Sequence, residues 1–330
     1  MKSYLCAMYS LGIAGVLTLT QGCAIKEMTG QPRVAMPVPA NYEIHRKPRA
    51  QLEEIARETI DEGRRYRHEL LSFRIQDIFE TQTNVVEQYL PKRRTGKKPL
   101  IVELPILGGD EYRLEQHFAR AFANKGYAVL FPHRPYVKDE IKQLEDVDGF
   151  LRESVLDAQR IIDWAQRQEG IDEKNVGIFG ASFGALRGVL ATALEPRVKA
   201  AVLGLGGADL AYIFMHTSDE GLTKHRERAL EKYGLTAEKA ESTLRGLLTY
   251  DPMRLAESVD TTKVFLVQAT HDKVVPAQTG DLLWELLGRP KRMNIWAGHL
   301  SALVYIPCIK AEAVKFFDEK LREKKNEKRH

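Results

Sequence analysis

The sequence predicts an α/β fold, in which helices cover both faces of a mostly parallel sheet of about eight strands. Short apolar runs alternate with longer amphipathic segments along most of the 330 residues, a pattern typical of successive strand–helix–strand units. No clear linker interrupts this alternation, and an apolar content of 44% is ample for one large core. We therefore expect a single domain over residues 51–325.

The predicted domain begins with a helix and two strands. Residues 51–67 carry apolar side chains at helical spacing, which predicts a lead-in helix; these are Leu52, Ile55, Ala56 and Ile60. Alternating apolar residues then predict strands at 70–78 and 84–90. The basic turn 92–98 separates them from a third strand at 100–104.

The central part of the chain follows the strand–helix rhythm more closely. A helix at 112–125 and a strand at 127–131 form one unit, and a long amphipathic helix at 147–167 leads to a buried strand at 175–179. A helix is expected at 185–191, directly after that strand.

The last third of the chain adds the remaining elements. Further strands are expected at 198–205, 263–269 and 292–296, and a helix closes the domain. Between the first two of these strands, residues 210–256 leave the rhythm with helical segments at 222–232 and 237–248.

The most informative motif is Gly180-Ala181-Ser182-Phe183-Gly184, which joins a predicted strand to a predicted helix. A serine in such a turn is held in a strained backbone conformation, with its hydroxyl raised above the sheet. The flanking glycines are required because strand and helix approach too closely there for a Cβ atom. We therefore interpret Ser182 as a nucleophile rather than as a helix-capping serine.

A nucleophilic serine needs a general base, and the base needs a carboxylate that orients it. His299 and Asp272 each follow a predicted strand, so they are expected beside Ser182 at the carboxyl edge of the sheet, where open α/β sheets bind their ligands. Asp209 follows the strand at 198–205 and is the alternative acid. We favour Asp272.

The chain order Ser182, Asp272, His299 and the Gly-x-Ser-x-Gly turn resemble the serine α/β-hydrolase superfamily. The segment Val274-Val275-Pro276 after the acid strengthens a resemblance to its esterase, dienelactone-hydrolase and prolyl-oligopeptidase-like branches. Dienelactone hydrolases proper use a cysteine nucleophile, so their own chemistry is not implied here. The resemblance implies the α/β-hydrolase fold and a carboxylesterase that cleaves small-molecule esters through an acyl-enzyme.

The resemblance extends over about residues 68–320. It leaves two alternatives open: a serine peptidase or amidase acting on small peptides, and a non-catalytic surface protein with a hydrolase fold. No propeller-like domain precedes the catalytic region to select peptides, and a binding protein has no reason to keep three catalytic groups. We therefore favour the esterase.

The resemblance also implies an oxyanion hole made by two backbone N–H groups. One belongs to Phe183, the residue after the nucleophile. The other comes from the loop at 105–110, where Leu107 and Gly108 are candidates and Leu107 is favoured. The helical insertion at 210–256 is expected to form a cap. Its aromatic and sulfur-containing residues either line the acyl pocket or pack inside the cap; these are Tyr212, Phe214 and Met215.

The N-terminus predicts export. Residues 1–22 contain an apolar stretch too short for a comfortable membrane span, and they end at Gly22-Cys23, similar to a bacterial lipoprotein cleavage site. We expect a signal peptide over 1–22, lipid attachment at Cys23 and a proline-rich tether over 23–50. An ordinary signal peptide or a short anchor are the alternatives. Ala24, which follows the cysteine, favours the outer membrane. We therefore expect a lipid anchor to hold the protein at the outer membrane of the cell envelope.

Charge and composition argue against other classes of protein. The formal charge of +4 is matched by residues 320–330, which hold six Lys or Arg and two Glu, so a nucleic-acid partner is not expected. The sequence has no phosphate-binding loop, and its histidines lack the spacing of zinc ligands. We expect no cofactor and no metal.

Overall fold

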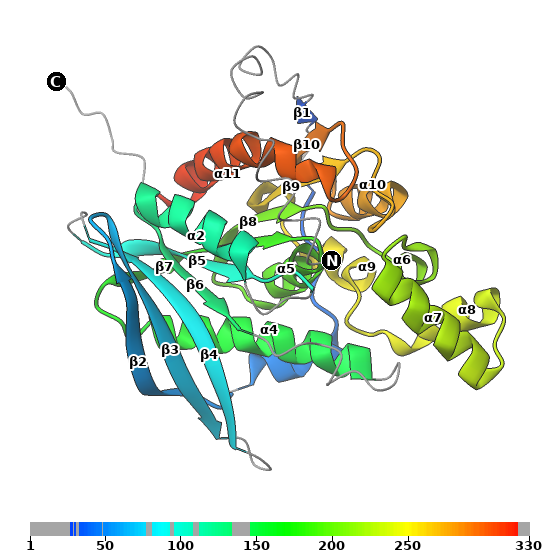
Figure 1. Ribbon diagram of the computed structural model, residues 1–330, viewed down its shortest axis with the longest axis horizontal. Coiled ribbons are helices and arrows are strands. Elements are labelled where there is room, and N and C mark those ends of the chain that lie inside the picture. Colours follow the sequence, from blue (N-terminus) through cyan, green and yellow to red (C-terminus); the bar gives the residue numbers. More distant parts are fainter. Residues whose placement is uncertain are drawn as a thin grey trace.

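The computed structural model describes residues 27–28, 30, 33–47, 49–76, 81–92, 96–107, 112–133 and 146–322. Its centre is a ten-stranded sheet (Figure 1). In their order across the sheet, the strands are β1 (Glu27–Met28), β10 (Lys291–Ile295), β9 (Val264–Ala269), β8 (Val198–Gly204), β7 (Ile171–Ala181), β5 (Lys98–Leu104), β6 (Ala128–Pro132), β4 (Thr81–Pro91), β3 (Tyr66–Gln76) and β2 (Leu52–Glu62). Six neighbouring strands run parallel: β10, β9, β8, β7, β5 and β6. Strand β1 joins β10 antiparallel, and β4, β3 and β2 continue the sheet antiparallel beyond β6.

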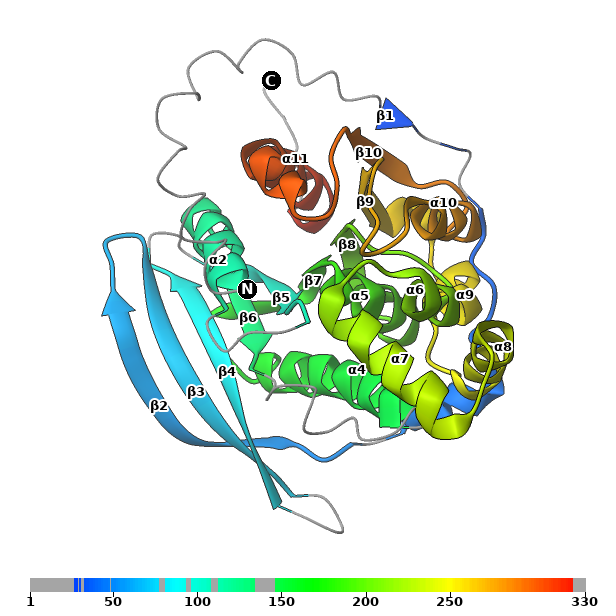
Figure 2. The ribbon, with the colours of Figure 1, turned by 45° about the vertical axis from the view of Figure 1, so that its right-hand side comes forward.

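Helices cover both faces of the sheet (Figure 2). Helices α2 (Arg113–Lys125) and α11 (Ile306–Leu321) pack on one face, where Phe122 and Phe317 are fully buried. Helices α4 (Asp146–Ala165), α5 (Phe183–Leu194) and α10 (Ala277–Leu286) pack on the other face through side chains such as Trp164 and Val189. Alternate residues of each central strand enter the two cores, so the predicted α/β-hydrolase fold is confirmed, with ten strands instead of about eight.

The expected helix at 51–67 is wrong, because most of this segment is strand β2. It pairs antiparallel with β3, and Ile55 and Ile60 are 43% and 46% exposed rather than packed on a helical face. A helix with this spacing would need a core to cover its apolar face, and no core covers Ile55 or Ile60. The neighbouring strand β3 instead pairs with most of the residues of β2, with two register shifts, and β-branched residues favour the strand conformation.

The tether expected at 23–50 is also corrected, as far as the structure describes it. Strand β1 extends the sheet along β10, and a 3₁₀ helix (Ala40–Arg46) packs on the domain with Tyr42 and His45 buried. The His45 ring nitrogens lie 2.9 Å from Gln159 Oε1 and 3.0 Å from the Tyr250 hydroxyl. Proline content therefore signalled irregular backbone here, but not a free linker.

The expected signal peptide and Cys23 lie outside the described residues. Within the ranges given above, no helix combines the length and apolar character needed to cross a bilayer.

The insertion between β8 and β9 is helical, as expected. It contains α6 (Leu210–His216), α7 (Glu220–Tyr233), α8 (Ala237–Leu247) and α9 (Pro252–Leu255). Met215 of α6 and Leu244 of α8 are buried in one apolar cluster with residues of α5, whereas α7 buries no side chain. The insertion is thus fixed to the α5 side of the sheet through α6 and α8.

Candidate active site

Ser182 occupies a sharp turn between β7 and α5. Its backbone has φ 54° and ψ −122°, a strained conformation for a non-glycine residue, and its N–H donates to the Gly204 carbonyl at 2.7 Å. A Cβ atom on Gly180 would lie 2.3 Å from the Gly184 carbonyl oxygen, and one on Gly184 would lie 2.0 Å from that of Leu104. Only glycine fits both positions, so the sequence motif forms the tight turn it predicted.

Two loops bring the expected base and acid to this turn. Strands β9 and β10 are parallel neighbours with Ala269 opposite Ile295, so the loops that follow them begin at the same level. Hydrogen bonds from Thr270 N–H to the Ile295 carbonyl (3.0 Å) and from His271 N–H to the Ala297 carbonyl (2.9 Å) hold the loops together. Asp272 and His299 are thereby placed side by side.

The three predicted residues form a continuous chain of hydrogen bonds. His299 Nδ1 lies 2.6 Å from Asp272 Oδ2, and His299 Nε2 lies 2.8 Å from Ser182 Oγ. Asp272 is 6% exposed, and its other oxygen accepts the backbone N–H groups of Val274 (2.9 Å) and Val275 (3.0 Å). With the imidazole proton on Nδ1, Nε2 is free to accept from the serine hydroxyl.

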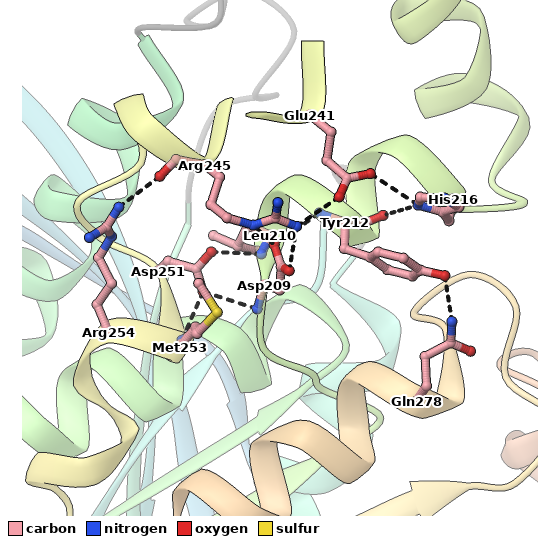
Figure 3. Close-up of polar contacts among 10 residues, drawn as sticks. All are labelled: Asp209, Leu210, Tyr212, His216, Glu241, Arg245, Asp251, Met253, Arg254 and Gln278. Carbon is pink, nitrogen blue, oxygen red and sulfur yellow. Dashed lines mark hydrogen bonds and ion pairs between the residues drawn. The ribbon is translucent and has the colours of Figure 1, made fainter. Parts of the chain in front are cut away.

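Asp209, the alternative acid, holds the helical insertion together instead (Figure 3). Its carboxylate caps α6 by accepting the Tyr212 N–H at 3.1 Å, and it pairs with Arg245 of α8 at 2.7 Å. The buried Asp251 accepts the N–H groups of Asp209 and Leu210 at 3.2 and 2.7 Å, and burial raises its pKa. The two aspartates fix the start of the insertion to its later part.

The strand β5 ends against the serine turn and continues into the loop expected to supply an oxyanion donor. The Ile106 N–H donates to Glu115 Oε1 at 2.8 Å, so this amide is engaged. The next amide along the loop is that of Leu107, the predicted donor. Gly108, the other candidate, lies outside the described residues. Phe183 is the first residue of α5, where backbone N–H groups have no partner within the helix.

Two buried charged residues that sequence reasoning missed hold this loop. Arg187 of α5 donates to the Pro105 carbonyl, and Glu115 of α2 accepts from Ile106, so consecutive residues of the loop are fixed from two helices. Both side chains are only 3% exposed. The signal was a charge inside an apolar helix: Arg187 stands within Ala-Leu-Arg-Gly-Val.

Carboxyl groups gather under the same loop. Glu103 of β5 is fully buried, its Oε2 has no hydrogen-bond partner among the described residues, and burial raises its pKa well above the usual range. Burial also raises the pKa of Glu115, although the Ile106 N–H partly offsets this. Glu103 is therefore neutral over a wide pH range, which limits the negative charge near the oxyanion loop.

Glu87 of β4 behaves in the opposite way. Burial acts to raise its pKa, but hydrogen bonds from His133, His68 and Gln116 outweigh burial and lower the pKa to about 2. Its two oxygens lie 2.8 Å from His133 Nε2 and 2.7 Å from His68 Nε2. His133, which follows strand β6, is thus engaged by a buried carboxylate.

The residues considered for an acyl pocket have different surroundings. Met215 is buried in the apolar cluster of the insertion, which is the packing alternative. Tyr212 and Phe214 are half-buried, and the Tyr212 hydroxyl accepts from Gln278 Nε2 of α10 at 2.5 Å (Figure 3). Phe183 stacks on Phe150 with ring centroids 5.8 Å apart.

Solved structures share this architecture. An acetyl xylan esterase from Paenibacillus sp. R4 superposes with a TM-score of 0.66, covering 85% of this chain and 92% of that one at 17% identity. Acetyl xylan esterase 1 from Thermoanaerobacterium sp. JW/SL YS485 gives 0.62 over 88% and 96% at 16% identity. At such low identity the likeness establishes the fold alone, which is the α/β-hydrolase fold.

Sequence comparison places the chain more narrowly. It belongs to the prolyl oligopeptidase family, whose family model matches residues 116–293 of the 330. It is also 32% identical over 114 residues to an uncharacterised 31.7 kDa protein in the traX-finO intergenic region of Escherichia coli. That match covers 34% of this chain and 39% of the relative, so it spans about two fifths of the relative's length.

Proposed function

We propose that the protein is a serine hydrolase that cleaves carboxylic esters through an acyl-enzyme. The observation that carries this proposal is the unbroken line of hydrogen bonds from Asp272 through His299 to Ser182, at 2.6 and 2.8 Å, on a strained turn. A serine that served only in packing would not need a strained backbone with φ 54°.

The mechanism follows from the order of these contacts. His299 Nε2 takes the proton from Ser182 Oγ as that oxygen attacks the ester carbonyl, and Asp272 stabilises the imidazolium. Backbone N–H groups of Phe183 and Leu107 receive the developing oxyanion. His299 then protonates the leaving alcohol, and a water molecule, activated by the same imidazole, releases the acid.

An ester is favoured as substrate because the architecture is shared along nearly the whole chain with proteins described as acetyl xylan esterases. Membership of the prolyl oligopeptidase family supports one competing substrate, a small peptide or amide. The described chain ahead of β5 forms strands of the central sheet, β2 to β4, rather than a separate substrate-selecting domain.

The first test is chemical. Ser182→Ala should lower hydrolysis of p-nitrophenyl acetate by on the order of 10⁶ and abolish labelling by a fluorophosphonate, because it removes the hydroxyl oxygen that His299 Nε2 contacts. Circular dichroism of the variant should match the parent. Unchanged turnover would refute Ser182 as nucleophile, and a folded parent that neither labels nor hydrolyses would favour a binding protein. Faster cleavage of a prolyl peptide anilide than of the ester would favour the peptidase.

We further propose that the protein is exported and held at the outer membrane by lipid on Cys23. The support is the apolar N-terminal stretch that ends at Gly22-Cys23. Mass spectrometry of the mature protein should find Cys23 as the acylated first residue, with the several chains that stable anchoring requires. An unmodified N-terminus at another residue would refute the anchor without affecting the proposed chemistry.

A further inference from the structure

The surface beside His299 carries an unusual concentration of exposed apolar side chains. We call it the outer apolar face: Trp296, Leu300, Leu303, Val304, Pro307 and Ala311. Trp296 is 78% exposed, Leu300 73% and Val304 58%. Exposed apolar surface that is contiguous, rather than scattered singly, marks an interaction site.

Helical geometry makes this face continuous. A 3₁₀ helix (Ser301–Tyr305) runs directly into α11, so the apolar residues from Leu300 to Ala311 recur at intervals of three and four and share one side. The opposite side of the same segment is buried in the core through Ala302, Ile309 and Ala313. The segment is therefore apolar on both its inner and its outer side.

The tryptophan is held at the end of this face. Its ring meets the His271 ring edge-on with centroids 4.9 Å apart, and its carbonyl accepts from the Tyr305 hydroxyl at 3.5 Å. His299 lies between Trp296 and Leu300 in the sequence. The outer apolar face thus adjoins the candidate active site.

Basic residues border the apolar surface. Lys310 and Lys315 flank Ala311 on α11, and exposed Lys273 is two residues from His271. The Lys310 ammonium donates to His117 Nε2 at 2.9 Å. The acidic Glu312, on the same helix, is paired with Lys291 at 3.2 Å. Apolar side chains edged by lysines are typical of helices that lie in the interface of a bilayer with anionic lipids.

Strand β1 runs antiparallel to β10, so its N-terminal end is the end nearer to Trp296. Glu27 pairs with Met293 and Met28 with Arg292, so β1 runs away from the end of β10 at which Trp296 lies. Cys23 precedes Glu27 by four positions, which span at most about 14 Å. Trp296 follows Met293 by three positions, which is about 10 Å of extended chain. The length of chain ahead of Glu27 therefore limits the distance from lipid on Cys23 to Trp296 to roughly 30 Å.

We propose that the outer apolar face docks on the lipid bilayer that holds the acyl chains of Cys23. This inference rests on the proposed lipid attachment and goes beyond the proposed chemistry. Docking places the active site next to the lipid surface, because His299 is part of the docked segment. Amphiphilic esters dissolved in the bilayer would then reach Ser182 without crossing water.

The tryptophans provide a direct test in the full-length lipidated protein. Trp164 and Trp284 are 3% and 9% exposed, so Trp296 is the tryptophan that lipid can reach. The protein is bound to phosphatidylcholine–phosphatidylglycerol vesicles with or without brominated acyl chains, and vesicle attachment is checked by flotation. We expect bromine to quench part of the emission, and Trp296→Phe to remove the quenchable part.

A matched pair of variants separates docking from anchoring. Val304→Asp should shift the balance between docked and undocked protein at least roughly tenfold, since it removes one buried apolar side chain from the interface. Ile55→Asp, on the similarly exposed edge strand β2, should leave quenching unchanged. Both variants should still float with the vesicles.

Each outcome decides the proposal. Floating protein whose Trp296 is not quenched overturns docking while leaving the anchor and the esterase intact. Docking on lipid is also overturned if Trp296 is shielded from acrylamide in the absence of vesicles. A second copy of the chain then covers the outer apolar face if the protein sediments as a dimer, and its own N-terminal segment covers it if the protein is monomeric. Activity on p-nitrophenyl acetate, measured separately, tests only the proposed chemistry.

Discussion

At the scale of single residues, the two aspartates that follow β8 and β9 have different tasks. Asp272 faces His299, whereas Asp209 caps α6 and pairs with Arg245. Both follow an apolar strand, so the sequence favoured one of them without excluding the other. The choice depends on which loop lies beside the histidine loop, and that is fixed by the pairing of β9 with β10.

Substitution of these aspartates separates their roles. Asp272→Asn should lower kcat by on the order of 10⁴, because the amide favours the wrong tautomer of His299. Asp209→Asn should retain most activity and instead weaken the attachment of the insertion. Steady-state kinetics with p-nitrophenyl acetate measure both. If the two effects are reversed, the acid follows β8 and the assignment fails.

At the scale of elements, the catalytic turn was predictable and its support was not. The Gly-x-Ser-x-Gly pattern is local. Each glycine indicates a close approach of two backbone segments, which the tight strand-to-helix turn explains. The contacts of Glu115 and Arg187 with the loop after β5 join α2 and α5 to a segment distant in sequence. The charge of Arg187 within an apolar helix is a local sign of a buried polar contact, but the sequence does not show which distant segment supplies the partner.

The β5 loop yields a prediction of its own. Glu115→Ala should lower kcat by up to about 10² with little change in KM, because the freed Ile106 amide lets the neighbouring oxyanion donor move. Glu115→Gln keeps an acceptor oxygen and should restore most of kcat. A purely structural role would show itself as equal losses of stability in both variants without this difference in kcat.

The segment 51–67 shows the limit of periodicity. Apolar residues three to four apart predict a helix only if a core covers them, and here the neighbouring strand β3 offers backbone partners instead. The residues around β1 illustrate the same limit, since two residues joining a sheet edge carry no periodicity at all. The parallel strands were predictable because each one is a short apolar run that enters both cores.

At the scale of the whole molecule, buried carboxyl groups set opposite slopes of stability with pH. The pKa of Glu87 falls from 4.5 in the unfolded chain to about 2 in the fold, so its contribution is complete above pH 4.5 and is lost as pH falls towards 2. Glu103 has a raised pKa, so its ionisation opposes folding as pH rises from 4.5 through its folded pKa.

Urea unfolding between pH 3 and pH 8 measures both slopes. Glu87→Gln should flatten the acid side, where the parent loses about 2 kcal/mol by pH 3. Glu103→Gln should flatten the decline above pH 4.5, which can reach about 1.4 kcal/mol per pH unit for one proton. A parent whose stability did not change between pH 5 and pH 3 would contradict the assignment of Glu87.

The strand β2 forms one outer edge of the sheet and carries a consequence for solubility. A long edge strand exposes unpaired backbone groups to any other chain, and such edges recruit neighbours into aggregates. Here the pairing with β3 is interrupted by register shifts near Ala56 and Asp61, which twist the ribbon. Exposed charges line its length: Glu53, Glu54, Arg57, Glu58, Asp61 and Glu62. A strand from a second molecule would have to desolvate these charges against a kinked ribbon, so both features disfavour further growth of the sheet at β2.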